Sequence, residues 1–262
     1  MRPVTHTYLL GDAMKKAGFA RKATDGIVIL LVIAILIAIL SDLLSGRRTE
    51  NCLQPQRYAH SCLLIDAGHG GEDGGAVSVT GTYESTLNLA IALKMRQLCG
   101  LFGIDAELIR SDDSSLKSRD SKTLAEMKRT DLKNRVKRIN AAQNACLISI
   151  HQNFFTSSKD HGAQVFYAPT ASSQSWGSYC QQLLVEQIEP TNHRQSKQIS
   201  KDIYLMNHIS CPAILVECGF LSNPTEAAQL EQGNYQTKLA LVILGSYMTY
   251  QNTNEGETPL EK

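Results

Sequence analysis

The sequence has few of the features that mark several common classes of protein. Of its 262 residues only 6% are aromatic and one is tryptophan, so no platform of rings for stacking on sugars is evident. The net charge of +1 gives no indication of a nucleic-acid surface. The seven cysteines include no C-x-x-C pair, which argues against a zinc finger, and Cys52 and Cys62 are the one pair that we would test for a bridge.

Several catalytic motifs are missing as well. No histidine directly precedes a glutamate, which excludes the H-E-x-x-H motif of many zinc proteases. G-x-S-x-G and the Walker A sequence are also absent, so neither a nucleophile elbow nor a P-loop is predicted. The stretch Gly68-His69-Gly70 begins like a dinucleotide fingerprint, but Asp73 stands at the third glycine position. These glycines instead indicate a tight turn.

A long apolar run stands near the N-terminus. Residues 26–40 contain no polar side chain, and the run reaches the roughly 20 residues of a bilayer-spanning helix if Asp42 lies at the interface. We therefore predict a transmembrane anchor over residues 26–45. Basic residues in the preceding tail, residues 1–25, favour a cytoplasmic N-terminus with the rest of the chain outside.

Two other interpretations of this run are a buried core helix and a cleaved signal peptide. A core helix would normally show a polar stripe, which the run lacks. A signal peptide needs small residues just before its cleavage site, and residues 39–48 offer no good pair. We favour the uncleaved anchor and leave cleavage open. The uncleaved anchor and the cleaved signal peptide would both place the chain from about residue 50 onward outside the cytoplasm.

The exported part reads as one domain over residues 58–251, between a polar linker at 46–57 and a polar tail at 252–262. Short apolar runs rich in β-branched residues predict strands at Cys62–Ile65, Ile104–Ile109, Cys146–Ile150, Gln164–Tyr167 and Ala213–Val216. Longer stretches between and after them predict helices at Glu84–Leu101, Met127–Gln143, Ser173–Ile188, Thr225–Glu231 and Tyr235–Tyr250. This alternation predicts an α/β fold, with helices on both faces of the sheet.

Ligands of such sheets gather beyond the carboxyl ends of the strands. Three predicted strands are followed there by His69, His151 and Glu217, and a predicted helix begins at Glu84. Two imidazoles and one carboxylate are a typical catalytic zinc set, and a further carboxylate would move the proton. The spacing defines no local metal motif, however, and a glutamate at a helix start also complements the helix dipole. Glu72, which forms H-x-x-E with His69, stays open as a rival ligand to Glu84.

Four stretches then resemble a known family. In order along the chain, LLIDAGHGGEDGGA, YESTLNLAIAL, LISIHQNFF and PAILVECGFLSNPTEAAQL resemble the zinc-dependent N-acetylmuramoyl-L-alanine amidases (type 3) of bacterial cell walls, over residues 63–250. The stretches GAQVFY, DIYLMNH and NYQTKLA are most similar to the membrane-anchored, germination-specific branch that acts in the spore cortex. The resemblance implies a twisted, mostly parallel sheet flanked by helices.

The resemblance also implies an activity and a site. It implies hydrolysis of the amide between N-acetylmuramic acid and the L-alanine of the stem peptide, during formation of muramic-δ-lactam. His69, Glu84 and His151 match the ligands of one zinc ion, and Glu217 matches the general base and acid. Glu84 is thereby favoured over Glu72.

The implied partners are the glycan strands and stem peptides of peptidoglycan and, through the anchor, the membrane; nucleic acid is not expected and an accessory protein is left open. The catalytic domain would lie outside the cytoplasm, for a spore enzyme between forespore and mother cell. Many relatives have arginine at Met206, so a substrate contact by that arginine is not expected here. Roles for Arg135 and Asn153 are not assigned.

Three alternatives remain at this point. They are a vegetative amidase for septum cleavage or wall turnover, a catalytically silent wall-binding regulator on the same fold, and a zinc carboxypeptidase on a related fold. The presence of all four site residues argues against the silent regulator.

Overall fold

The structure is a computed structural model that describes residues 62–255. The predicted cytoplasmic tail, anchor and linker lie outside the described residues, as do Cys52 and residues 256–262 of the predicted polar tail. Within the described residues, no helix combines the length and the apolar character that crossing a membrane requires.

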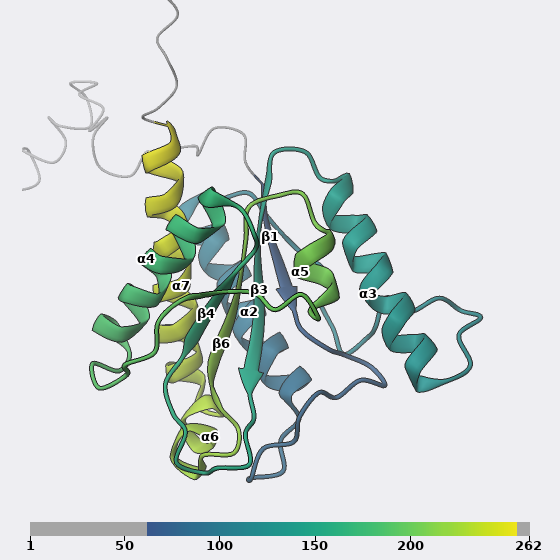
Figure 1. Cartoon of the computed structure of the whole chain (residues 1–262), viewed down its shortest axis with the longest axis horizontal. Coiled ribbons are helices and arrows are strands. Elements are labelled where there is room, and N and C mark those ends of the chain that lie inside the picture. Colours follow the sequence, from purple (N-terminus) through teal and green to yellow (C-terminus); the bar gives the residue numbers. More distant parts are fainter. Residues whose placement is uncertain (1–61, 256–262) are drawn as a thin grey trace, which may run out of the picture. The chain divides into compact units, whose positions relative to one another are not determined.

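A six-stranded sheet lies at the centre of the described residues (Figure 1). The strand order is β2-β1-β3-β6-β4-β5. Every neighbouring pair is parallel except β4 with β6, which is antiparallel. The strands are β1 Cys62–Ala67, β2 Ala106–Leu108, β3 Ala145–Asn153, β4 Gln164–Tyr167, β5 Lys197–Gln198 and β6 Ala213–Phe220. The predicted α/β class is therefore confirmed.

Helices cover both faces of this sheet. The first face carries α2 (Glu84–Phe102), α4 (Ala171–Gln187) and α7 (Gly233–Glu255). Of these, α7 packs against both α2 and α4, and all three contribute to one core cluster. The second carries α3 (Leu124–Ala141) and α5 (Tyr204–His208), which contribute to a separate cluster. The short α6 (Pro224–Leu230) packs against β6. Figure 1 shows α3 and α5 on the opposite side of the strands from α4 and α7.

The central strands are buried on both faces because they lie between these two layers. In β1, Leu63 and Ile65 belong to the first cluster, whereas Leu64 between them belongs to the second. The same alternation holds in β3 for Ile148 and Leu147. A side-chain period of two with apolar residues on both faces explains why these strands read as continuous apolar runs.

The structure differs from the sequence prediction in where β3 and β6 end. Both strands continue past their apolar runs, so His151 and Glu217 lie inside the strands rather than after them. The parallel ladder between β3 and β6 continues through these two residues, which are paired in register, and it shifts only between His151 and Asn153. Two elements were not predicted, β5 and α5, and both are very short.

Candidate metal centre and its cavity

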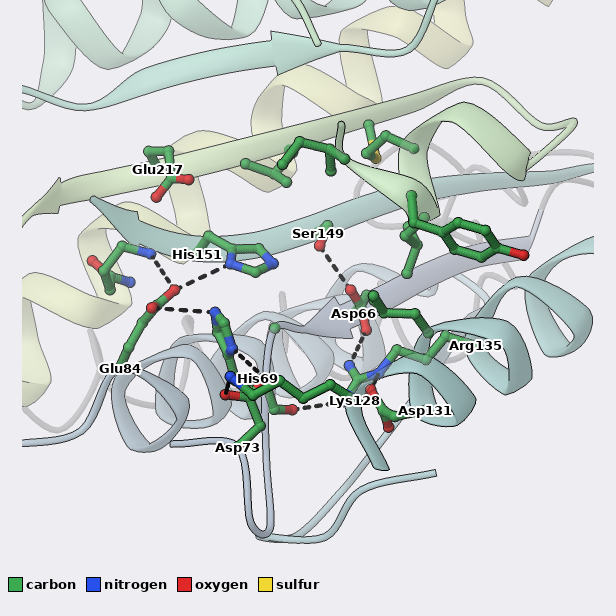
Figure 2. Close-up of a pocket in the computed structure, with 18 of the residues that line it drawn as sticks. Asp66, His69, Asp73, Glu84, Lys128, Asp131, Arg135, Ser149, His151 and Glu217 are labelled. Carbon is green, nitrogen blue, oxygen red and sulfur yellow. Dashed lines mark hydrogen bonds and ion pairs between the residues drawn. The ribbon is translucent and has the colours of Figure 1, made fainter. Parts of the chain in front are cut away.

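The three predicted metal ligands meet at the carboxyl end of the sheet. His69 follows β1, Glu84 begins α2, and His151 lies near the end of β3. His69 Nε2 lies 3.2 Å from Glu84 Oε2, and His151 Nδ1 lies 3.1 Å from Glu84 Oε1. One ligand atom from each residue can be chosen so that all lie within 4.8 Å of one another. Figure 2 shows the two imidazoles next to each other, each facing the Glu84 carboxylate.

Glu84 is held at the centre of this group by the main chain of two segments. Its Oε2 accepts a hydrogen bond from the amide of Ala76 at 3.1 Å, and its Oε1 accepts one from the amide of Gln152 at 3.1 Å. Burial alone would raise the pKa of Glu84, but the hydrogen bonds and charges of His151 and His69 outweigh it and hold the pKa far below its usual range. The carboxylate is therefore ionised, as a metal ligand must be.

His69 is fixed by its ring and by its backbone. It is a non-glycine residue with a left-handed conformation, φ 62°. Its ring Nδ1 pairs with Asp73 Oδ2 at 2.9 Å, which directs Nε2 toward Glu84. Burial lowers the pKa of His69, but the hydrogen bonds to Asp73 and Glu84 prevail and raise it to about 9. The negative potential that attracts a proton to this ring would equally attract a metal cation.

His151 is positioned by its strand and by the absence of a side chain opposite it. A Cβ atom added to Gly68 would lie 2.2 Å from Cε1 of the His151 ring, closer than any real contact. Gly68 therefore leaves the space that the imidazole fills. The rings of His69 and His151 lie edge to face, with their centroids 5.1 Å apart. Two imidazoles and one buried carboxylate, all converging, fit the donor set of a catalytic zinc ion.

Glu217 lies beside this group on β6, across the ladder from His151. Its Oε2 is buried and has no hydrogen-bond partner among the described residues. Burial raises the pKa of Glu217 to about 7, against the opposing effect of the His151 charge. A carboxyl group with this pKa can both accept and donate a proton near neutral pH.

A cavity of about 400 Å³ extends from these four residues toward α3 and α5. Lys128 and Leu132 of α3 line one side, and Tyr204, Leu205 and Met206 of α5 line another. The cavity therefore has charged groups at the metal ligands and apolar groups at α5. Met206 itself is fully buried and presents an apolar wall to the cavity.

The structure also places the residues that the sequence left open. Glu72 is exposed and pairs with Lys117 and with Ser115 Oγ, the latter at 3.2 Å, and it is not part of the converging group. The geometry therefore favours Glu84 over Glu72 as the ligand. Asn153 accepts a backbone hydrogen bond from Leu221 at 2.8 Å.

Arg135 is almost completely buried, although it lines the cavity. Its guanidinium binds Asp66 Oδ1 at 2.6 Å, Asp131 Oδ2 at 2.8 Å, and the carbonyl oxygens of Ala67 and His69. The guanidinium therefore donates its hydrogen bonds to groups of the protein itself. Arg135 therefore supports the segment that follows β1.

Three further residues that support the site were missed by the sequence analysis. Asp73 orients His69, and Asn88 donates to Glu84 Oε1 at 3.3 Å and to the carbonyl of Gly68 at 3.2 Å. Arg110 donates to the carbonyls of Ala67 and Gly68. Asn88 follows Glu84 by four residues on α2, a spacing that places both on one helix face and could have been noticed. The sequence gives no comparable signal for Arg110.

Comparison with known proteins gives a consistent result. The family model described as N-acetylmuramoyl-L-alanine amidase matches residues 63–246. The germination-specific N-acetylmuramoyl-L-alanine amidase of Bacillus subtilis (strain 168) is 37% identical over 198 residues, which cover 75% of this chain and 82% of that protein. The amidase AmiA of Escherichia coli (strain K12) is 26% identical over 231 residues, which cover 72% of this chain and 75% of that protein.

Two solved structures are also similar. One is the CwlD amidase of Clostridioides difficile in complex with the GerS lipoprotein, with a TM-score of 0.71, 38% identity, and coverage of 74% of this chain and 100% of that one. The other is the catalytic domain of the amidase CwlV from Bacillus (Paenibacillus) polymyxa, with a TM-score of 0.61, 28% identity, and coverage of 74% and 99%.

Proposed function

The chain belongs to the N-acetylmuramoyl-L-alanine amidase family, and from that premise we propose how its residues carry out the reaction. The enzyme is a peptidoglycan amidase, which hydrolyses the amide between N-acetylmuramic acid and the L-alanine of the stem peptide. The proposal is that His69, Glu84 and His151 hold one zinc ion and that Glu217 transfers the proton. The observation that carries it is the convergence of these three ligands beside a buried carboxyl oxygen of Glu217, which has no hydrogen-bond partner in the part of the chain that the structure describes.

Zinc held by such a donor set polarises a carbonyl and lowers the pKa of bound water. The residues of the chain keep the ligands in the ionisation state and the orientation that metal binding requires. Glu84 remains ionised because two backbone amides and two imidazoles surround its carboxylate. Asp73 occupies Nδ1 of His69, so Nε2 is the ring nitrogen that faces the other ligands.

Glu217 is placed to serve both proton transfers. With a pKa raised to about 7 by burial, it can accept a proton from the attacking water at its carboxylate. It can then donate that proton to the alanine nitrogen, which leaves as a neutral amine. The cavity toward α3 and α5 offers the room in which the substrate would lie beside these groups.

Digestion of purified peptidoglycan tests the reaction and its metal dependence together. The full-length enzyme is incubated with the polymer, with a chelator, and with the chelator followed by added zinc. Mass spectrometry should detect free stem peptides beginning at alanine in the first and third reactions only. Release of shortened stem peptides would instead indicate a carboxypeptidase, and undiminished release in the chelator would contradict the zinc proposal.

We further propose that this amidase acts in the spore cortex and is attached to the membrane by residues 26–45, with the catalytic domain outside the cytoplasm. The similarity to the germination-specific enzyme of Bacillus subtilis supports the role. An accessory protein is also proposed, because the similar CwlD amidase was solved in complex with the GerS lipoprotein.

Expression in Bacillus subtilis lacking its germination-specific amidase tests this role. Restored muramic-δ-lactam in the cortex would support it, and a chain that changes only vegetative wall turnover would contradict it. Recovery of the chain in the soluble fraction, rather than with membranes, would contradict the anchor.

A further inference from the structure

The three converging ligands differ in what holds them. His151 lies on a central strand, and Glu84 begins a helix and receives two backbone amides. His69 lies on neither a strand nor a helix, because β1 ends at Ala67. It also has a left-handed backbone, which costs a residue with a side chain about 1 kcal/mol or more. Something other than secondary structure must therefore fix this residue.

The backbone and the ring of His69 are fixed by different groups. Arg135 Nη2 donates to the carbonyl oxygen of His69 at 2.6 Å. The ring is held by Asp73, whose Oδ2 lies 2.9 Å from Nδ1. Figure 2 shows Asp73 next to His69, on the side away from His151.

Asp73 is itself fixed by three further residues. Its backbone amide and carbonyl exchange hydrogen bonds with Gly70, at 3.2 and 2.8 Å, which closes the loop between them. Its Oδ1 pairs with Lys128 Nζ at 2.7 Å and accepts from the amide of Gly75 at 3.3 Å. Oδ2 is thus left to His69, and the carboxylate cannot turn away without breaking an ion pair.

We propose that Asp73 is a positioning residue of the metal centre, which sets the tautomer and the direction of the His69 ring. By accepting from Nδ1–H, it leaves Nε2, on the side of Glu84, as the nitrogen whose lone pair binds the metal once that nitrogen has released its proton. It also makes that nitrogen a stronger donor, as carboxylates behind metal-bound histidines generally do. This inference rests on the proposed zinc site.

Zinc affinity of the full-length chain tests the inference without reference to catalysis. Zinc dissociation constants are measured by competition with a chromophoric chelator for the wild type, Asp73→Ala and Asp73→Asn. Loss of a carboxylate behind a histidine ligand weakens metal binding by about 10- to 100-fold, and we expect that range for Asp73→Ala. Asp73→Asn keeps an acceptor for Nδ1–H but no charge, so its affinity should lie between those of Asp73→Ala and the wild type.

Glu72→Ala is the matched control. Glu72 precedes Asp73 in the same loop and also pairs with a lysine, but it does not contact His69. This variant should bind zinc as tightly as the wild type. A loss of affinity equal to that of Asp73→Ala would show that the loop, rather than the Asp73 carboxylate, determines binding, and would overturn the inference.

The visible spectrum of the cobalt-substituted proteins gives a second readout. A change in the ring direction of His69 should alter the d–d bands in Asp73→Ala, whereas Glu72→Ala should reproduce the wild-type bands. If Asp73→Ala does not fold, the isosteric Asp73→Asn decides, and unchanged affinity and bands in that variant would overturn the inference. A wild-type chain that binds no zinc would instead overturn the proposed metal site, and the inference with it.

Discussion

The site is assembled from two regions that are stabilised in different ways. One region is the pair of strands β3 and β6, which present His151 and Glu217 side by side in a continuous ladder. The other is the loop between β1 and α2, residues 68–83, together with the ligands His69 and Glu84 at its two ends. In the first region, backbone pairing fixes the side chains. In the second, the side chains of Arg110, Arg135 and Asp73 hold the start of the loop and the His69 ring, and substitutions should affect the two regions differently.

The largest expected effect is a loss of activity in the strand region without a loss of structure. Glu217→Gln keeps the size of the side chain but removes its ability to exchange a proton. Amide hydrolysis should fall by about 10²- to 10⁴-fold, the usual contribution of a general acid–base group. Zinc content and unfolding midpoint should remain those of the wild type. Activity within a few-fold of the wild type would remove Glu217 from the proposed role.

The next effect is on stability, and it concerns the ion pairs beneath the loop. Asp66 is buried against Arg135 and accepts from Ser149 Oγ at 2.7 Å. Asp66→Asn would leave the buried guanidinium without one of its two carboxylates. Breaking a buried pair in this way costs about 3–5 kcal/mol, and we expect a drop in the free energy of unfolding toward that range. Urea denaturation measures it, and a change below 1 kcal/mol would show that Asp131 alone compensates Arg135.

The same pair predicts a pH dependence. Burial alone would raise the pKa of Asp66, but Arg135 and Ser149 outweigh it and hold the pKa below its ordinary value of 3.8. The folded state therefore binds this proton less readily than the unfolded chain. The stabilisation is present above pH 3.8 and is lost as the pH falls below it. Denaturation of the wild type and Asp66→Asn between pH 3 and pH 7 should give two stability curves whose separation begins to shrink below pH 3.8.

The difference between the regions also explains what the sequence could predict. Apolar β-branched runs identified all four central strands, because strands buried on both faces need them. The predicted ends of β3 and β6 come too early in the chain, because backbone pairing between the two strands, rather than composition, extends the ladder through His151 and Glu217. The short elements α5 and β5 carry too few residues for a periodic signal.

The residues of the site, like the strands, could be predicted in part from the sequence. His69, Glu84, His151 and Glu217 were identified from strand ends, a helix start and the family resemblance, and the structure brings them together. The groups that support the loop were not identified. Arg135 donates to a carbonyl 66 residues earlier in the chain, and Arg110 to one 42 residues earlier. Such contacts depend on the tertiary fold and leave no local pattern.

A smaller effect is expected where the two regions touch. Gly68→Ala would place a methyl group 2.2 Å from the His151 ring, so the ring or the loop must move. Overpacking of this kind costs about 1–3 kcal/mol of stability. Because the displaced group is a predicted ligand, zinc affinity should fall as well. Gly100→Ala in the same chain is a suitable control, since its nearest neighbour would be the end of the Arg96 side chain at 3.7 Å.

The smallest expected effect concerns the ion pair between Lys128 and Asp73, as distinct from the hydrogen bond between Asp73 and His69. Lys128 is about half exposed, and its ion pair with Asp73 should contribute only about 0.2–1 kcal/mol to stability. Lys128→Met leaves the bond between Asp73 and His69 in place, so zinc affinity should change much less than in Asp73→Ala. A salt titration adds a test, because the small difference between the wild type and Lys128→Met should shrink as ionic strength rises. If Lys128→Met instead weakens zinc binding as much as Asp73→Ala does, the ion pair with Lys128 is required to hold the Asp73 carboxylate against His69. An exposed charge would then determine the geometry of the loop, and the contrast between the two regions would not hold.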